Sequence, residues 1–289
     1  MGVQFLTVLG AGQMGSGIAQ VAATGGYDVT LYDPHPGAIQ KGLASIRAVL
    51  ARGVERSSLT SAAAEAALAR IKTAETLPVA VAQADFVIEA APEDLALKLD
   101  LFAQLDRVAP AHAVLATNTS AKSITEIAGA TRTPHRVVGM HFFNPVPKMR
   151  LVEVIRGLET DEATVATTLQ VAARMGKETV EVSEFPGFAT SRINAMIGNE
   201  AFYMLMEGVA SARDIDKALK LGLNHPMGPF ELGDLVGWDT RLKNLEYLHQ
   251  TLGEKFRPCP LLIKYVKAGR LGRKVGRGVY DYTVKEESP

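Results

Sequence analysis

Three polar segments of the chain each follow a short apolar run, and their side chains could together support proton transfer. They are Glu89 to Glu93, Asn118-Thr119-Ser120 and His141-Phe142-Phe143-Asn144-Pro145. Histidine titrates near neutral pH, so His141 is a candidate base for the proton of an alcohol. Glu153 lies on the next apolar run and could return beside His141 to orient its ring. A histidine that only satisfies a strand end is the structural alternative.

A glycine pattern near the start of the chain, Gly10-Ala11-Gly12-Gln13-Met14-Gly15, joins an apolar run to a helical one. In dinucleotide-binding turns the first glycine permits the tight turn, the second admits the pyrophosphate, and the third lets the helix pack on the strand. Asp33 stands eighteen residues beyond Gly15, where a carboxylate could bind ribose hydroxyls and repel a 2′-phosphate. The pattern therefore predicts NAD rather than NADP. A turn that merely connects two elements is the alternative.

The scaffold for these segments is predicted from the alternation of short apolar runs with helical patterns, such as the helix expected over 94–108. This order indicates an α/β fold with a Rossmann-type, doubly wound parallel sheet. Ligands of such sheets bind beyond the carboxyl ends of the strands, where the three polar segments fall. Strands are expected at 5–9, 28–32, 86–89, 113–116, 137–141 and 151–155.

The pattern changes at Glu184-Phe185-Pro186-Gly187, where proline and glycine interrupt the periodicity. We therefore expect two domains, an NAD-binding domain over 1–184 and an all-α domain over 185–289. Ser211 with Asp214 predicts a helix start, and Gly222 its end. An apolar face of the first helix is expected from Ile193, Ile197, Ala201, Met204 and Leu205.

The composition excludes several classes of protein. Lys plus Arg and Asp plus Glu both number 31 in 289 residues, so no net charge favours nucleic acid or an anionic membrane. The single cysteine, Cys259, allows no internal disulfide and no cysteine-rich metal site. No signal-peptide core or lipidation motif is recognised. We expect a cytoplasmic protein without a metal ion or a membrane anchor.

The chain resembles the 3-hydroxyacyl-CoA dehydrogenase family, especially its single-function bacterial members, over almost its whole length. The resemblance rests on the glycine pattern, Asn118-Thr119-Ser120 and the continuation of the His141 segment to Pro147. It also rests on His225-Pro226-Met227-Gly228-Pro229-Phe230-Glu231-Leu232 and on Leu271-Gly272-Arg273-Lys274 with Gly276 and Gly278-Val279-Tyr280.

The resemblance implies NAD-dependent oxidation of a 3-hydroxyacyl-CoA, with short chains such as 3-hydroxybutyryl-CoA expected, and the reverse reaction. It implies that His141 is the catalytic base, that Glu153 is its partner, and that Ser120 binds the substrate hydroxyl beside the nicotinamide. It also implies a homodimer formed by the C-terminal domain. The cofactor contacts expected from the glycine pattern and the resemblance are Gly10, Gly12, Gln13, Met14, Gly15, Asp33, Glu93, Lys98, Ser120, Asn144 and Lys274.

The substrate contacts include one departure from the family. Many members carry Asn where this chain has Ser191, and Ser191 is expected to keep a weakened role in holding the acyl group, with catalysis affected. Asn144 is expected to contact substrate as well as cofactor. Arg47 and Arg52 lie where the family meets the CoA phosphates, although exposed arginines on a helix are ordinary.

Two other functions remain open at the level of sequence. One is a dehydrogenase of a free 3-hydroxy acid, as in the gulonate-oxidising relatives. The other is a catalytically silent NAD-binding protein, against which the intact His141 and Glu153 argue.

Overall fold

The computed structural model describes residues 2–283 of the chain. The chain divides into two compact units, Met1–Phe185 and Pro186–Pro289, one residue beyond the boundary expected from the sequence. In the described residues no helix is long and apolar enough to cross a membrane.

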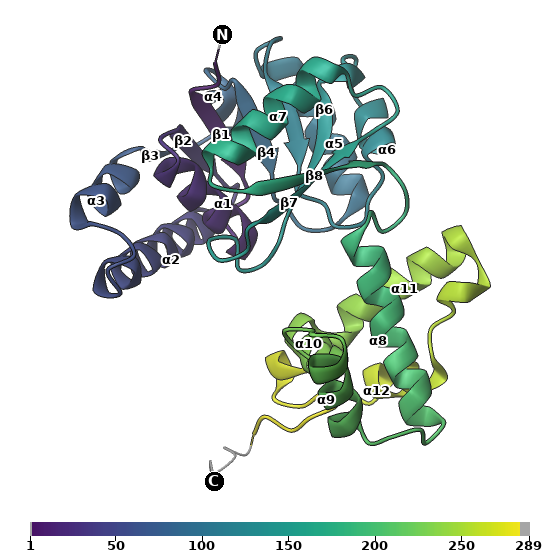
Figure 1. The fold of residues 1–289 in the computed structure, drawn as a ribbon. Coiled ribbons are helices and arrows are strands. Elements are labelled where there is room, and N and C mark those ends of the chain that lie inside the picture. Colours follow the sequence, from purple (N-terminus) through teal and green to yellow (C-terminus); the bar gives the residue numbers. More distant parts are fainter. Residues whose placement is uncertain (1, 284–289) are drawn as a thin grey trace. The chain divides into compact units, whose positions relative to one another are not determined.

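The first unit is built on an eight-stranded sheet in the order β3-β2-β1-β4-β5-β6-β7-β8 (Figure 1). All neighbouring strands are parallel except β6 and β7, which are antiparallel. The sequence pattern predicted six of these strands, but it missed β3 and β8 and the antiparallel pair. The strands are β1 (Phe5–Leu9), β2 (Asp28–Tyr32), β3 (Ile71–Thr73), β4 (Phe86–Glu89), β5 (Val114–Thr117), β6 (Val137–Phe142), β7 (Leu151–Arg156) and β8 (Glu178–Ser183).

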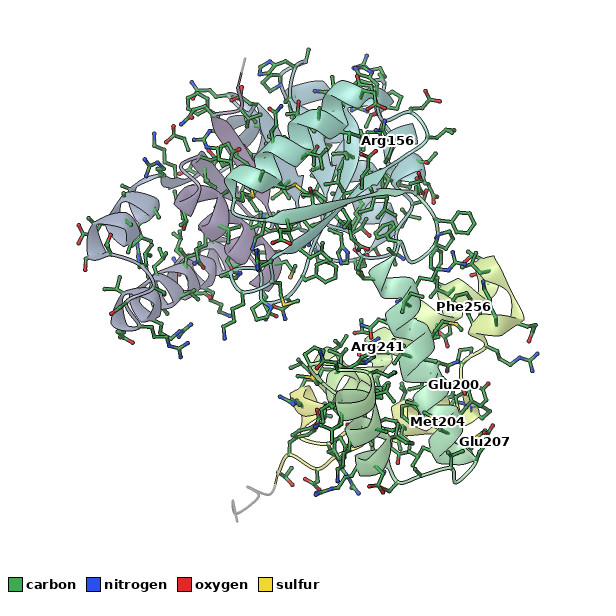
Figure 2. All side chains as sticks on the ribbon, in the orientation of Figure 1. Arg156, Glu200, Met204, Glu207, Arg241 and Phe256 are labelled. Atoms are coloured by element: carbon green, nitrogen blue, oxygen red, sulfur yellow. The ribbon has the colours of Figure 1, made fainter. Side chains whose placement is uncertain are left out.

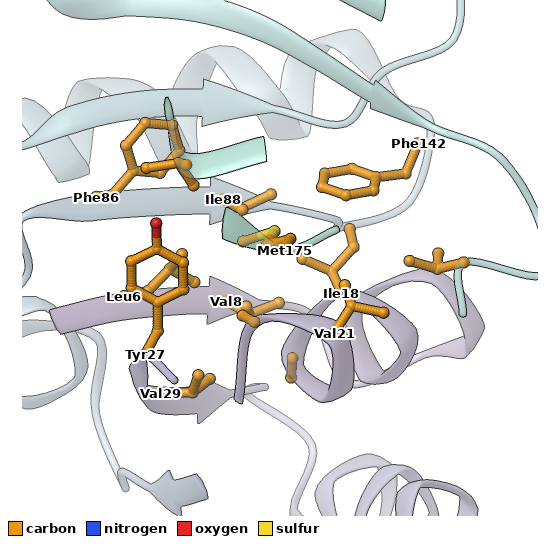
Figure 3. Packing of buried hydrophobic residues seen from close by; sticks show 14 of the residues in the cluster. Leu6, Val8, Ile18, Val21, Tyr27, Val29, Phe86, Ile88, Phe142 and Met175 are labelled. Atoms are coloured by element: carbon orange, nitrogen blue, oxygen red, sulfur yellow. The ribbon is translucent and has the colours of Figure 1, made fainter. Parts of the chain in front are cut away.

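Helices cover both faces of this sheet. Successive side chains of a strand point to opposite faces, and the central strands β4, β5 and β6 are buried at every position. Leu6 and Val8 of β1 pack with Ile18 and Val21 of α1 and with Met175, as Figure 3 shows. Thr7, between them, donates its hydroxyl to the Ala80 carbonyl of α4 on the other face (2.7 Å). The helices are α1 (Gln13–Thr24), α2 (Pro36–Glu55), α3 (Ser61–Ala69), α4 (Leu77–Val81), α5 (Leu95–Val108), α6 (Ile124–Gly129) and α7 (Glu162–Arg174), with a 3₁₀ turn at η1 (Pro134–Arg136).

A buried ion pair ties the end of α5 to the start of β6. Asp106 accepts hydrogen bonds from the Thr133 hydroxyl, from the Arg132 N–H (2.9 Å) and from the Arg136 guanidinium (3.2 Å). Burial alone would raise the pKa of Asp106, but these hydrogen bonds and the Arg136 charge outweigh it and lower the pKa from 3.8 to about 2.

Replacement of this carboxylate by the Asp106→Asn change should lower the free energy of unfolding at pH 7 by about 2 kcal/mol or more. Because the folded-state pKa is depressed, the contribution of Asp106 is complete above its unfolded pKa and is lost as the pH falls through about 2. Urea unfolding followed by circular dichroism should show the difference between wild type and variant shrinking by about half at pH 3. An equal difference at both pH values would contradict this account.

The second unit is helical, with a core in which Phe202 makes edge contacts with Phe230, Trp238 and Tyr265. Ser211 accepts from the Asp214 N–H and begins α9, which ends at Gly222, so both predicted signals are confirmed. The helices are α8 (Thr190–Met206), α9 (Ala212–Gly222), α10 (Pro229–Val236), α11 (Trp238–Leu252) and α12 (Pro260–Lys267), with 3₁₀ turns at η2 (Glu254–Phe256) and η3 (Arg273–Val275).

The buried face of α8 differs in part from the predicted one. Ala201 is buried and Ile197, Met204 and Leu205 are partly buried, as expected, but Ile193 is 61% exposed. The other buried residues of the helix are Ala195, Gly198, Asn199 and Phe202. Positions seven residues apart share a helix face, so Ile193 lies on the face of the exposed Glu200. Figure 2 labels Glu200 and, just beyond the end of α8, the exposed Glu207. The prediction for Ile193 was therefore wrong; the buried face is the one on which Phe202 packs edge-on against Trp238.

A buried carboxylate on α10 fastens the last described residues to this core. Asp234 accepts hydrogen bonds from the Trp238 indole (2.6 Å), the Val279 N–H (2.8 Å), the Tyr280 N–H (2.9 Å) and the Tyr282 hydroxyl (3.0 Å). A Cβ on Gly278 would lie 1.9 Å from an Asp234 oxygen. Glycine is thus required at position 278 by close packing against Asp234.

Candidate active site

The glycine turn after β1 has the geometry that the sequence predicted. Gly10 has a φ of +98°, and a Cβ there would lie 2.6 Å from the Ala90 carbonyl oxygen. A Cβ on Gly15 would lie 1.8 Å from the Gly10 carbonyl oxygen, so α1 can pack against the turn only with glycine at this position. Gly12 differs, since a Cβ there would have no described atom within 4 Å. Gly10 and Gly15 are therefore needed for packing, while Gly12 leaves open space.

The start of α1 offers backbone donors toward that open space. The helix begins at Gln13, and no side chain of the described residues caps its N-terminus. Asp33, at the end of β2, accepts from the Ala11 N–H (2.9 Å) and from the His35 N–H (2.9 Å), and so holds the turn from the other side. An uncapped helix start, an open glycine and an adjacent carboxylate fit the pyrophosphate and adenosine ribose of a dinucleotide.

His141 and Glu153 face each other across the antiparallel pair β6 and β7. The two residues are directly opposite in the register, and the His141 Nδ1 lies 2.7 Å from a Glu153 carboxylate oxygen. Glu153 is completely buried and His141 is 7% exposed. The Phe143 ring lies 4.5 Å from the imidazole, centroid to centroid. The predicted pair is therefore formed, by a strand reversal that the sequence pattern did not reveal.

The Asn118-Thr119-Ser120 segment lies beside the end of β6. Asn118 accepts the Phe142 N–H (2.8 Å), which ties the end of β5 to the residue after His141. Ser120 is exposed, and its N–H and hydroxyl donate to one oxygen of Glu93 at 2.9 and 3.3 Å. The Thr119 hydroxyl donates to the same oxygen at 2.6 Å. Ser120 and Glu93 are thus brought together at the carboxyl edge of the sheet.

Lys98 is held inside the unit. Its side chain is 1% exposed, and its ammonium lies 2.7 and 2.9 Å from the two oxygens of Glu89 and 3.5 Å from Glu93. Glu89 was noted in the sequence as a polar strand end but was not selected as a site residue. Its completely buried side chain is a property that a single sequence does not display.

The other predicted residues are distributed over the two units. Asn144 is exposed on the loop after β6, and Arg47 and Arg52 are exposed on α2. Ser191 and Lys274 belong to the second unit, where Ser191 is half-buried in the first turn of α8. The Lys274 ammonium pairs with Asp239 at 2.6 and 2.7 Å.

A cavity of about 310 Å³ lies in the first unit beside α1 and α2. The cations in its lining are Lys148, Arg150 and Lys177, none of which the sequence analysis selected. Lys177 donates to the Val146 and Met149 carbonyls (2.5 and 2.8 Å), and burial lowers its pKa. Arg150 pairs with Glu178. Lys148 is exposed and makes no ion pair within the described part of the chain.

Comparisons with known proteins identify the family of the chain. Residues 5–185 match the model of the 3-hydroxyacyl-CoA dehydrogenase NAD-binding domain, and residues 187–282 match that of the C-terminal domain. A probable 3-hydroxybutyryl-CoA dehydrogenase of Bacillus subtilis is 51% identical over 286 residues, which are 99% of both chains. A 3-hydroxybutyryl-CoA dehydrogenase of Bradyrhizobium diazoefficiens is 48% identical over 95% of this chain and 94% of its own.

Solved structures lead to the same group of proteins. The crystal structure of (S)-3-hydroxybutyryl-CoA dehydrogenase from Ralstonia eutropha superposes with a TM-score of 0.94 at 43% identity, covering 98% of this chain and 100% of that one. The doubly wound sheet and its glycine turn indicate dinucleotide binding, and the match to the dehydrogenase NAD-binding domain defines an NAD-dependent oxidoreductase. The chain belongs to the 3-hydroxyacyl-CoA dehydrogenase family.

Proposed function

We propose that the protein interconverts (S)-3-hydroxyacyl-CoA and 3-oxoacyl-CoA with NAD, and that its substrates are short, such as 3-hydroxybutyryl-CoA. The observation that carries the proposal is the buried His141–Glu153 pair (2.7 Å) in the same unit as the glycine turn. The Bradyrhizobium relative and the solved structure named above are described as 3-hydroxybutyryl-CoA dehydrogenases, and the Bacillus relative as a probable one, which supports the choice of a short acyl chain.

In this proposal His141 is the general base. Its Nδ1–H donates to the buried Glu153 carboxylate, and Nε2 takes the proton of the 3-hydroxyl group. The turn from Gly10 to Gly15 and Asp33 would hold NAD, which would supply the acceptor for the hydride of C3. The negative charge of Glu153 stabilises the imidazolium that proton transfer creates, and the 0% exposure of Glu153 keeps that charge from water. Ser120 is proposed to hold the substrate oxygen. Asn144 is proposed to contact both the cofactor and the substrate, and Ser191 the acyl group.

The assay that tests the function measures NADH consumption with acetoacetyl-CoA and with longer 3-oxoacyl-CoAs. We expect turnover with acetoacetyl-CoA and a clear preference for NADH over NADPH, because Asp33 would repel a 2′-phosphate. No turnover would overturn the proposal, and activity on a free 3-hydroxy acid alone would assign the protein to the gulonate type. Binding of NADH without turnover of either substrate would indicate a silent NAD-binding protein.

The cavity beside α2 is proposed to hold the phosphates of CoA. Its lining supplies cations from the loop after β6, and Arg47 and Arg52 add positive charge on α2. Lys148 carries the argument, since no described carboxylate neutralises it. Anionic phosphates would gain from such uncompensated charge.

Charge reversal at this position, Lys148→Glu, is therefore expected to raise KM for acetoacetyl-CoA by about tenfold with little change in kcat. The matched control is Lys72→Glu, an exposed lysine on β3, which should leave KM unchanged. Acetoacetyl-pantetheine lacks the nucleotide phosphates, so its KM should not respond to Lys148→Glu. An equal rise for both substrates would rule out a phosphate contact.

The partner and the location are also proposals. The second unit exposes large apolar side chains at Val209 (64%), Leu221 (77%) and Leu223 (65%), which favours a homodimer formed by this unit. Sedimentation equilibrium should give twice the 30.9 kDa mass of the chain; a monomer at micromolar concentration would contradict the proposal. A cytoplasmic location, expected from the single cysteine, is testable by cell fractionation.

A further inference from the structure

Glu89 occupies the carboxyl end of β4, between the cofactor turn and the Ser120 segment. In the sheet register it stands between Leu9 of β1 and Thr117 of β5. Leu9 directly precedes Gly10, and Thr117 stands three residues before Ser120. One completely buried carboxylate therefore lies between the two halves of the candidate site.

The four acceptor positions of this carboxylate are all used within the protein. The Lys98 ammonium reaches both oxygens (2.7 and 2.9 Å), the Ala91 N–H donates to one of them (2.7 Å) and the Thr117 hydroxyl to the other (2.6 Å). An ionised carboxylate has about four such positions. Glu89 has no capacity left for a ligand, so its effect must pass through the groups that it holds.

One path from Glu89 leads to Ser120. Lys98 lies between two carboxylates, with Glu89 on one side and Glu93 at 3.5 Å on the other. The opposite oxygen of Glu93 receives the Ser120 N–H and hydroxyl at 2.9 and 3.3 Å. The chain of contacts from Glu89 through Lys98 and Glu93 to Ser120 is continuous.

A second path leads to the cofactor turn. By accepting the Ala91 N–H, Glu89 fixes the peptide that joins Ala90 to Ala91. The Ala90 carbonyl is the group that approaches Gly10 so closely that no Cβ fits there. Displacement of the Ala90–Ala91 peptide would therefore change the shape of the turn that is to receive the dinucleotide.

We propose that Glu89 is a positioning residue for both the dinucleotide turn and Ser120, and that Lys98 acts through Glu93 instead of touching the cofactor. Neutralising Glu89 leaves the Lys98 ammonium buried with only the more distant Glu93 as a counter-charge. Burial of a poorly compensated charge is unfavourable, so Lys98 would shift toward Glu93 and draw it away from Ser120. The inference about Ser120 rests on the proposed function.

The test compares Glu89→Gln with Asp106→Asn, which also neutralises a buried, ion-paired carboxylate of the first unit. Asp106 contacts Arg136 at the start of β6, at the opposite edge of the sheet from the site. At a temperature where both variants are folded, Glu89→Gln should raise the Kd of NADH by about tenfold and lower kcat by about tenfold. In Glu89→Gln, KM for acetoacetyl-CoA should stay within about twofold of wild type. In Asp106→Asn, the Kd of NADH, kcat and KM should all stay within about twofold of wild type. Equal behaviour of the two variants would overturn the proposal.

A double-mutant cycle tests the path to Ser120. In a Ser120→Ala background Glu89→Gln should lower kcat by less than about threefold, because the group through which it acts is gone. A full tenfold loss in both backgrounds would disprove this path. Should Glu89→Gln fail to fold, Lys98→Met serves with the same control; it should lower kcat about tenfold, and an unchanged kcat would again overturn the proposal.

Fluorescence of bound NADH is measured without an acyl substrate. If the wild type failed to reduce acetoacetyl-CoA, the proposed function would be wrong. The NADH fluorescence measurement would still show whether Glu89→Gln weakens NADH binding.

Discussion

Replacement of His141 by glutamine is expected to lower kcat for the reduction of acetoacetyl-CoA by about a thousandfold, within the range that a positioned acid or base contributes. Glutamine can still donate to the buried Glu153 but cannot carry the proton that reaches the substrate oxygen. The Kd of NADH should stay within about twofold, since the glycine turn and Asp33 are untouched.

The control for this prediction is His112→Gln. The His112 side chain is 66% exposed and pairs with Asp85 at the amino-terminal side of β4, so its loss should leave kcat unchanged. Steady-state kinetics with NADH and acetoacetyl-CoA measure both variants. A His141→Gln enzyme within tenfold of wild type would show that another group transfers the proton.

The second large effect is expected from alanine at two glycines of the same turn, which should both weaken NADH binding but differ in their effect on the melting temperature. Gly15→Ala places a Cβ 1.8 Å from the Gly10 carbonyl oxygen, so α1 must move away from β1. Overpacking of this kind costs about 1 to 3 kcal/mol or more, and both the melting temperature and NADH binding should fall. Gly12→Ala meets no described atom within 4 Å, so the fold should keep its melting temperature.

NADH binding distinguishes the two variants further. The Cβ of Gly12→Ala would enter the space left for the pyrophosphate, and the Kd of NADH should rise by about a hundredfold in a folded protein. Differential scanning calorimetry and NADH fluorescence give the two readouts. Unchanged NADH affinity in Gly12→Ala would mean that the dinucleotide does not cross this glycine.

The sequence allowed prediction of the features that depend on local pattern. The six predicted strands lie within one residue of their observed ends, because each is an apolar run bounded by polar residues. The prediction that Glu153 returns beside His141 is also confirmed. The antiparallel arrangement of β6 and β7 was missed because the prediction used the alternation of strands and helices, which implies parallel neighbours. The connection between these two strands departs from that alternation, since it carries no helix.

Properties that depend on tertiary packing were less accessible. The resemblance implies a cofactor contact for Lys98, yet its ammonium is enclosed by Glu89 and Glu93, which come from β4 and the turn after it. An exposed lysine and a buried one look alike in a single sequence. Ile193 was placed on the wrong face of α8 since the buried face is set by packing against residues far along the chain, such as that of Phe202 on Trp238.

The hydrogen bonds of Asp234 set an order in which the two units can form during synthesis. The first unit is contiguous up to Phe185, so it can fold while about a hundred residues are still to be added. The second unit cannot complete its core until Val279, Tyr280 and Tyr282 have left the ribosome, because these residues supply three of the four donors to the buried Asp234. A nascent chain halted before Val279 would contain a folded dinucleotide-binding unit followed by helices that still lack these three hydrogen bonds to Asp234.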